Sequence, residues 1–367
     1  MYSLTEILVM FAIVRVLQRI YYLLNGHVQH GRAFSPPHEL KRWLKEKGIP
    51  IAQHRFVCKN NQKIELRYRR IGTGPKLFLL ANGVGTDLFM WLPVFKAMLR
   101  RNPRLFTEFT LIAPSYRGLF GSGGIDGSVE ASMSCLAGDV LEILAHCSRN
   151  SREGQGFDSI VGWSMGAQVA LTCVTAHPHV ADKLFLLNPS GGRTLHTAFQ
   201  PFVPIPYIGK SVSSAMRALL AALRRLTFTV AWKRVKTATS SIYFRLFLEL
   251  FSLLGGFPPE LGAYFEQYLR DVFSSRAQTR GLLDLILSLD DKLPDAAFLL
   301  EHKSTVVSSV SDFLTGVYHG MFLCTAMINA TFKPVLFGSH FLLLEWPDSL
   351  AKDVLELLQS TKKHALR

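Results

Sequence analysis

Short apolar runs alternate with longer amphipathic segments through the middle of the chain. Each run is almost wholly apolar and then meets a turn, as buried parallel strands do; the runs lie at 76–83, 109–114, 158–163 and 183–192. Between them, apolar residues recur at helical spacing in 91–101, 128–147 and 164–177. The alternating segment at 63–72 predicts a further strand. This order predicts a mostly parallel sheet with helices on both faces.

The pattern changes between residues 193 and 300, where no strand-like run is evident. Helical periodicity dominates there, as in 214–226, 243–254 and 281–289. Strand-like runs return at 304–314 and 332–341, and a last helix is predicted at 348–359. A long helical block therefore interrupts one α/β unit. Pro334 lies inside the last strand, and because proline has no N–H, that strand is expected at an edge of the sheet.

The chain is accordingly divided into five parts. They are an apolar, amphipathic helix that associates with a membrane (1–24), a linker with a short charged helix (25–50), the first part of the α/β core (51–193), a helical insertion (194–302) and the second part of the core (303–367).

The N-terminal segment is apolar but broken by charge. Its uninterrupted apolar run, 7–14, is too short to cross a bilayer, and Arg15 and Arg19 follow it. Residues 4–24 place these arginines and Gln18 on one helical face, which suits a helix lying in a membrane interface. A spanning anchor, or a helix packed on this protein or on a partner, remains an alternative.

Charge and cysteine usage bear on partners and compartment. Lys and Arg together number 41 against 27 Asp and Glu. The basic residues are spread along the chain and lie within apolar stretches, as in 216–236, with no zinc-ligand spacing or RNA-binding signature. We therefore expect an anionic membrane surface rather than nucleic acid as the partner. The five cysteines are odd in number and form no close pairs, which indicates reduced thiols in a cytosol-facing compartment.

A serine between two glycines lies where the strand 158–163 is followed by a helix. The string is Gly162-Trp163-Ser164-Met165-Gly166, and this strand–turn–helix context is that of a nucleophile elbow. Side chains at Gly162 and Gly166 would collide in so sharp a turn. The helix N-terminus beside Ser164 favours developing negative charge. Ser164 is therefore the candidate nucleophile, and a chance match in an ordinary turn is the alternative.

A serine nucleophile needs a base and an orienting carboxylate. His340 follows the last strand, and Asp312 ends the strand before it, so both fall at the edge of the sheet where Ser164 lies. The interval between them holds one helix and one strand. No acidic residue follows the strand at 183–192. The nearby carboxylates in connecting sequence are expected to be solvated; they are Asp290, Asp291 and Asp295.

The oxyanion of an acyl-transfer reaction needs two N–H donors. The first is expected from Met165, the residue after the nucleophile. The second is expected from Val84, because the loop Asn82-Gly83-Val84-Gly85 follows a buried strand and lets the backbone approach closely. An ordinary turn is the alternative for this loop.

These residues, in the order Ser164, Asp312 and His340, resemble the α/β-hydrolase superfamily. The resemblance covers 63–193 and 304–358 and includes the segment 113–123, which is similar to the Pro-Asp-x-Arg-Gly segment of the family but has Ser115 for the aspartate. Asn82 stands where the family commonly has histidine. A serine nucleophile differs from the aspartate of the related haloalkane dehalogenases and epoxide hydrolases.

The resemblance implies that the helical insertion forms a cap over the active site. The cap is rich in Leu and Phe and carries a basic-aromatic patch at 229–236, which suits an apolar acyl group and a lipid interface. The predicted function is hydrolysis of carboxylic, lipid-like acyl esters by a Ser–His–Asp triad, with no metal or organic cofactor. Acyl transfer by the same triad and a non-catalytic binding module are the alternatives.

Overall fold

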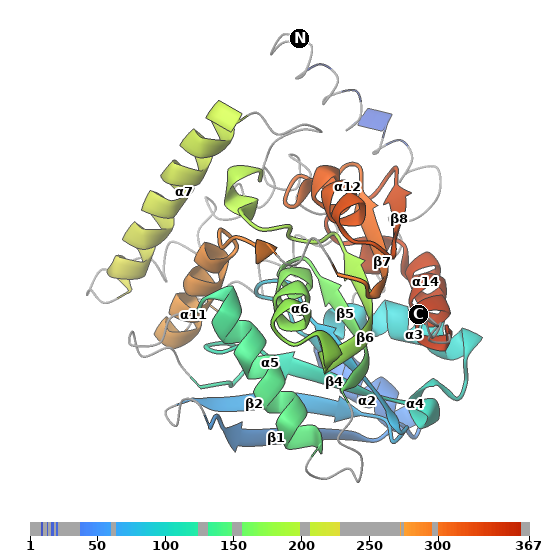
Figure 1. Ribbon diagram of the computed structural model, residues 1–367. Helices are drawn as coiled ribbons and strands as arrows, with labels where there is room; N and C mark the ends of the chain where they lie inside the picture. Colours follow the sequence, from blue (N-terminus) through green and yellow to red (C-terminus); the bar gives the residue numbers. More distant parts are fainter. Residues whose placement is uncertain are drawn as a thin grey trace.

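Eight strands form one mostly parallel sheet at the centre of the protein (Figure 1). The computed structural model describes residues 9, 13, 16–17, 20, 37–59, 64–123, 131–148, 156–198, 206–227, 272, 275–295 and 300–360. The strands are β1 (Ile51–Val57), β2 (Glu65–Ile71), β3 (Lys76–Ala81), β4 (Phe109–Ser115), β5 (Phe157–Trp163), β6 (Ala181–Leu187), β7 (Lys303–Ser309) and β8 (Ala330–Val335). Their order is β1-β2-β4-β3-β5-β6-β7-β8; β2 is antiparallel to both neighbours, and all other pairs are parallel.

Helices cover both faces of this sheet (Figure 1). One face packs against α2 (Pro37–Glu46), α3 (Leu92–Arg101), α13 (Leu342–Glu345) and α14 (Pro347–Gln359). The other packs against α5 (Met133–Ser148), α6 (Met165–Ala176) and α12 (Gly316–Ala326). Shorter elements are α4 (Leu105–Glu108) and the 3₁₀ helices η2 (Leu88–Trp91), η3 (Pro178–Val180) and η4 (Thr194–His196). The predicted α/β architecture is confirmed.

The sheet edges show what the apolar pattern predicted and what it did not. β8 pairs only with β7, so the expectation that Pro334 marks an edge strand is correct. β1, at the other edge, was not predicted. Its centre is polar, with Gln53, His54 and Arg55, and several of its side chains are exposed. A strand that is solvated along an edge does not need the apolar run by which buried strands are recognised.

The predicted linker contains a helix that belongs to the core. In α2, Leu40, Trp43 and Leu44 are buried against the cluster formed with α3 and α14. The exposed face of α2 is strongly charged. These charges dominate the sequence of the segment, which is why it was interpreted as a linker. The first helix after β4 also differs: α5 begins at Met133 rather than at 128, because the Ser132 hydroxyl accepts a hydrogen bond from the Cys135 N–H and caps the helix there.

Two α-helices of the insertion are described between β6 and β7, namely α7 (Pro206–Leu226) and α11 (Arg276–Ser288). The predicted helix at 243–254 and the basic-aromatic patch at 229–236 lie outside the described residues. The expectation that Asp290 is solvated is wrong, because its buried carboxylate forms an ion pair with Arg217 at 2.5 Å and ties the end of α11 to α7. Asp291 is also engaged: its side chain accepts a hydrogen bond from the Met133 N–H.

Of the N-terminal segment 1–24, five residues are described. Each is helical with an exposed apolar side chain; they are Val9, Ile13, Val16, Leu17 and Ile20. Within the described residues, no helix combines the length and apolarity needed to cross a bilayer. The predicted membrane-associating helix therefore stays a prediction. All five cysteines are free thiols.

Candidate active site

The turn between β5 and α6 holds Ser164 in a strained backbone conformation, with φ +55° and ψ −118°. A positive φ is costly for a residue with a side chain, and the surrounding contacts hold it in place. The Ser164 N–H donates to the Leu187 carbonyl at 2.9 Å, and the Ser164 carbonyl accepts from the Ser190 and Ala167 N–H groups. These bonds attach the turn to the carboxyl end of β6, and Ser164 is buried there.

The two glycines of the elbow are required by close approach. A Cβ at Gly166 would lie 1.9 Å from the Ala81 carbonyl oxygen at the end of β3. A Cβ at Gly162 would lie 2.7 Å from the Ala167 Cα and from the Gly166 oxygen. Since real Cβ atoms do not approach backbone this closely, both positions exclude larger residues. The sequence-based reason given for these two glycines agrees with the observed packing.

The loop after β3 lies beside the elbow. Val84 lines the cavity that contains Ser164, and Met165 is the first residue of α6. Asn82, which stands where the resembled family commonly has histidine, is buried and anchored twice. Its side-chain oxygen accepts from the Trp91 indole N–H at 3.0 Å, and its carbonyl accepts from the Tyr116 hydroxyl at 2.9 Å. The loop that carries Val84 is thus fixed from both the η2 and the β4 sides.

His340 and Asp312 lie together after the ends of β8 and β7. The His340 Nδ1 and the Asp312 Oδ2 are 2.7 Å apart, and both side chains are buried. Burial alone would raise the pKa of Asp312, but His340 and Thr315 lower it below its usual range, so the carboxyl is ionised at neutral pH. An ionised carboxylate only accepts hydrogen bonds, so His340 donates through Nδ1, which in the neutral ring makes Nε2 the acceptor.

Sequence reasoning missed the groups that hold this pair. The Thr315 hydroxyl lies 2.8 Å from the Asp312 Oδ2, and the Thr315 and Leu314 N–H groups both donate to the Asp312 Oδ1. The carboxylate therefore has four donors, including His340, and cannot rotate without losing several of them. The threonine follows the aspartate by three residues, which is the local signal that could have identified it.

The loop that carries His340, called the histidine loop below, is held through its backbone. The His340 carbonyl accepts from the Trp163 indole N–H and from the Asn188 side chain, each at 3.1 Å. Asn188 follows β6 and also accepts from the Ser309 N–H at 2.8 Å, so it ties the ends of β6, β7 and the histidine loop together. Trp163 directly precedes Ser164, so one residue of the elbow positions the loop that carries His340.

Ser164 and His340 face one cavity of about 270 Å³. No hydrogen bond joins the Ser164 hydroxyl to the His340 ring in the part of the chain described; such bonds are often long before substrate binds. The remaining wall is mostly apolar and comes largely from the insertion; it includes Leu195, Ala198, Met216, Leu282, Ile286 and Leu289. Across the described ranges, no three His, Cys, Asp or Glu side chains gather as ligands for a metal ion.

Residues 78–352 match the model of the alpha/beta hydrolase family. The chain belongs to that family. A comparison with curated proteins finds no match. Arg117, in the segment that resembles the hydrolase Pro-Asp-x-Arg-Gly motif, forms a buried two-bond ion pair with Asp139 of α5. This alpha/beta hydrolase therefore anchors the loop after β4 through the arginine, although Ser115 replaces the usual acidic residue of the motif.

Solved structures of the same fold include three bacterial enzymes. A hydrolase from Pseudomonas aeruginosa PA01 has a TM-score of 0.58 at 20% identity and covers 84% of this chain and 98% of its own. A thermophilic esterase from Thermogutta terrifontis has a TM-score of 0.58 at 19% identity, with 84% and 98% covered. A putative lipase from Acinetobacter baumannii AYE has a TM-score of 0.60 at 17% identity, with 88% and 94% covered. At these identities the likeness concerns the fold of the hydrolase.

Proposed function

We propose that this alpha/beta hydrolase cleaves carboxylic esters with Ser164 as nucleophile, His340 as base and Asp312 as the carboxylate that orients the base. One observation carries the proposal: the strained Ser164 and His340 line the same cavity, and His340 is hydrogen-bonded to the buried Asp312, although the three residues lie far apart in the sequence. A serine hydroxyl is activated by an imidazole that takes its proton and by a carboxylate that orients the imidazole and stabilises its charge.

In the proposed reaction, His340 acts first as a base and then as an acid, while Ser164 carries the acyl group. The His340 Nε2 takes the proton of Ser164 as its oxygen attacks the ester carbonyl, and Asp312 stabilises the imidazolium that forms. The amides of Val84 and Met165 hold the oxyanion. The imidazolium then protonates the leaving alcohol, and an acyl-enzyme remains. His340 then takes a proton from the water that attacks the acyl-enzyme and returns it to the Ser164 oxygen as the acid leaves. No step requires a metal or an organic cofactor.

The substrate proposed is a lipid-like acyl ester, such as a monoacylglycerol or lysophospholipid. The support comes from the cavity wall, where α7 contributes Met216 and α11 contributes Leu282 and Ile286 beside Ser164. Most polar residues that line this cavity come from the core, namely Thr86, Ser164, Thr315 and His340. At about 270 Å³ the cavity lies just below the range of roughly 300–1,000 Å³ usual for ligand pockets, which favours a single acyl chain over a bulky acyl group.

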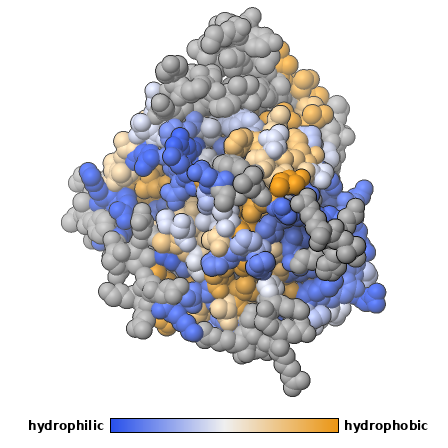
Figure 2. Space-filling model, viewed as in Figure 1, coloured by the Kyte–Doolittle hydropathy of each residue, from blue (hydrophilic) through white to orange (hydrophobic). Residues whose placement is uncertain are grey.

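Association with a cytosol-facing membrane surface is proposed for the whole protein. Figure 2 shows hydrophobic residues gathered on the side of α12 and β8. The exposed apolar side chains of that region are Met321, Phe322, Ile328 and Leu336. The described residues of the N-terminal segment are likewise exposed and apolar. With an excess of 14 positive charges, such surfaces suit an anionic lipid interface.

A fluorophosphonate probe tests the nucleophile. We expect labelling of the wild-type protein and none of Ser164→Ala, with ester hydrolysis reduced about 10⁴-fold or more in Ser164→Ala and His340→Ala. Ser308→Ala is the matched control, because Ser308 is also a buried serine but its hydroxyl has no hydrogen-bond partner within the described residues. Labelling that persists in Ser164→Ala, or equal loss in Ser308→Ala, would contradict the assignment.

Graded esters test the substrate and the alternatives. Hydrolysis of p-nitrophenyl esters from acetate to palmitate should be fastest at an intermediate chain length, and Met216→Trp should shift the optimum to shorter chains. Added alcohol should not capture most of the acyl group, since capture in preference to water would indicate acyl transfer. A protein that binds esters but neither cleaves them nor reacts with the probe would be a binding module.

A further inference from the structure

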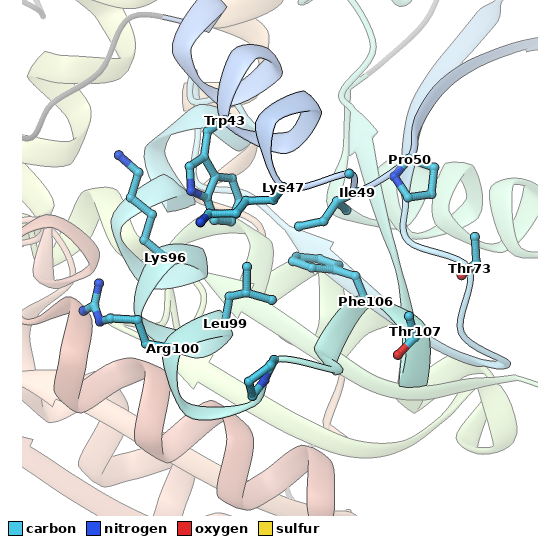
Figure 3. Close-up of a pocket in the computed structure, with 12 residues that line it drawn as sticks. Trp43, Lys47, Ile49, Pro50, Thr73, Lys96, Leu99, Arg100, Phe106 and Thr107 are labelled. Carbon is cyan, nitrogen blue, oxygen red and sulfur yellow. The ribbon is translucent and has the colours of Figure 1, made fainter.

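A second and larger cavity lies away from Ser164. It has a volume of about 830 Å³ and is formed where α2 ends, α3 ends and α4 begins (Figure 3). Thr73 precedes β3, and Thr107 precedes β4, so this cavity lies at the amino ends of these parallel strands. Ser164 and His340 follow carboxyl ends of strands. The two cavities therefore lie at opposite ends of the parallel strands.

The floor of this second cavity is apolar. Trp43 and Phe106 belong to the hydrophobic core and are almost wholly buried, while Leu99 and Ile49 pack against that core and complete the surface. In Figure 3, the Trp43 ring, Leu99 and Phe106 face the same space from α2, α3 and α4. Such a floor can cover a short hydrocarbon chain or ring and remove it from water.

The rim of the cavity is cationic. Lys47, Lys96 and Arg100 line it, and none of its twelve lining residues is acidic. Lys96 has one partner just outside, Glu39, at 3.1 Å. Arg100 shares the single carboxylate of Asp348 with the neighbouring Arg101, at 3.0 and 2.8 Å. Lys47 forms no ion pair within the described residues.

Positive charge at the rim is therefore only partly balanced, and it stands over an apolar floor. Lys96 and Arg100 lie one helical turn apart on α3, so both heads reach the same side of the cavity, as Figure 3 shows. Lys47 lies beside Trp43. An anionic head group can thus be placed among the three cations while an attached apolar body lies on Trp43 and Phe106. A neutral or cationic ligand gains only the second of these interactions.

We propose that this cavity binds a small amphiphilic anion, namely a carboxylate with an attached apolar chain. The ligand is held by its charge at Lys47, Lys96 and Arg100 and by its chain on the apolar floor. The site is separate from the one at Ser164, and the proposal does not depend on ester hydrolysis.

Photo-cross-linking with a diazirine-bearing decanoate tests this site in the full-length protein. We expect cross-links within 43–50 and 96–107, mapped by mass spectrometry, and displacement by unmodified decanoate. Lys47→Glu should reduce these cross-links about tenfold, because an attraction at the rim becomes a repulsion. Lys45→Glu is the matched control: it makes the same charge change at an exposed position of α2, outside the cavity.

Four results would overturn the proposal. They are equal labelling by the corresponding decanol diazirine, equal loss in Lys47→Glu and Lys45→Glu, cross-links confined to residues around Ser164, and displacement by vesicles containing phosphatidylserine but not by dissolved decanoate. The last would assign the cavity to a lipid surface. Because cross-links in Ser164→Ala should match those of the wild-type protein, failure of the proposed hydrolase activity leaves this test intact.

Discussion

Replacing Gly166 by alanine should separate the elbow from the loop that carries Val84. The new Cβ would lie 1.9 Å from the Ala81 carbonyl oxygen and 2.7 Å from the Asn82 oxygen, and both atoms are backbone. To restore a contact of about 3.0 Å, α6 and the end of β3 must part by about 1.1 Å. Because the Asn82 backbone is held by Tyr116, the loop cannot move aside on its own.

The consequences are predicted for both stability and reactivity. Overpacking of this kind costs about 1–3 kcal/mol of unfolding free energy. A displacement of about 1 Å between the proposed nucleophile and the groups proposed to hold the oxyanion should slow fluorophosphonate labelling of Ser164 about 100-fold. Gly162→Ala should have a smaller effect on both stability and labelling. Its new Cβ would lie 2.7 Å from backbone atoms of the same turn, which need to move only about 0.3 Å to restore a contact of about 3.0 Å.

Thermal unfolding and the labelling rate are to be measured together on the same preparations. Gly138→Ala is the matched control: Gly138 lies within α5 and a Cβ there would meet nothing within 4 Å. That change should stabilise the protein by about 0.4–1 kcal/mol and leave labelling unchanged. Gly166→Ala with wild-type stability and labelling would refute the packing described for the elbow. A greater loss in Gly162→Ala than in Gly166→Ala would refute the order derived from the distances.

Three further changes test other parts of the structure. Thr315→Val should slow labelling of Ser164 about tenfold and Thr315→Ser much less, because only the valine removes the hydroxyl from Asp312; equal rates would contradict a positioning role. Burial lowers the pKa of His319 to about 4, whereas a histidine in an unfolded chain has a pKa of about 6.5. The neutral ring therefore makes its full contribution to stability above pH 6.5, and this contribution is lost as the pH falls towards 4. In urea unfolding, the stability difference between wild type and His319→Gln should shrink by about 2 kcal/mol from pH 7.5 to pH 5, and an unchanged difference would show that this histidine does not titrate as expected. Asp139→Asn should cost about 3–5 kcal/mol in chemical denaturation, because the buried Arg117 loses its counter-charge; a cost below 1 kcal/mol would indicate that water replaces it.

The local pattern of the sequence was enough to predict most of the sheet. Buried strands are recognisable because the part of a strand that is covered on both faces must be apolar, as at 77–81 and 184–187. Pro334 identified the β8 edge because a missing N–H cannot be accommodated inside a ladder. Gly162 and Gly166 identified the elbow, since a strand-to-helix turn this tight excludes side chains.

The same pattern could not reveal contacts between residues far apart in the chain. Trp163 and Asn188 both bind the carbonyl of His340, more than 150 residues away for each, and nothing in their immediate surroundings indicates that partner. β1 was not predicted because its exposed edge needs no apolar run.

The sequence alone therefore predicted most of the buried elements and the candidate residues that follow them, namely Ser164, Asp312 and His340, whose catalytic roles stay proposals. The way these groups are held, and their surroundings, became visible only in the folded protein, from the four donors on Asp312 to the cationic cavity between α2, α3 and α4. This division arises because periodicity records only whether each residue faces water or the core. The identity of its neighbours there is set by the packing of elements that are distant in sequence.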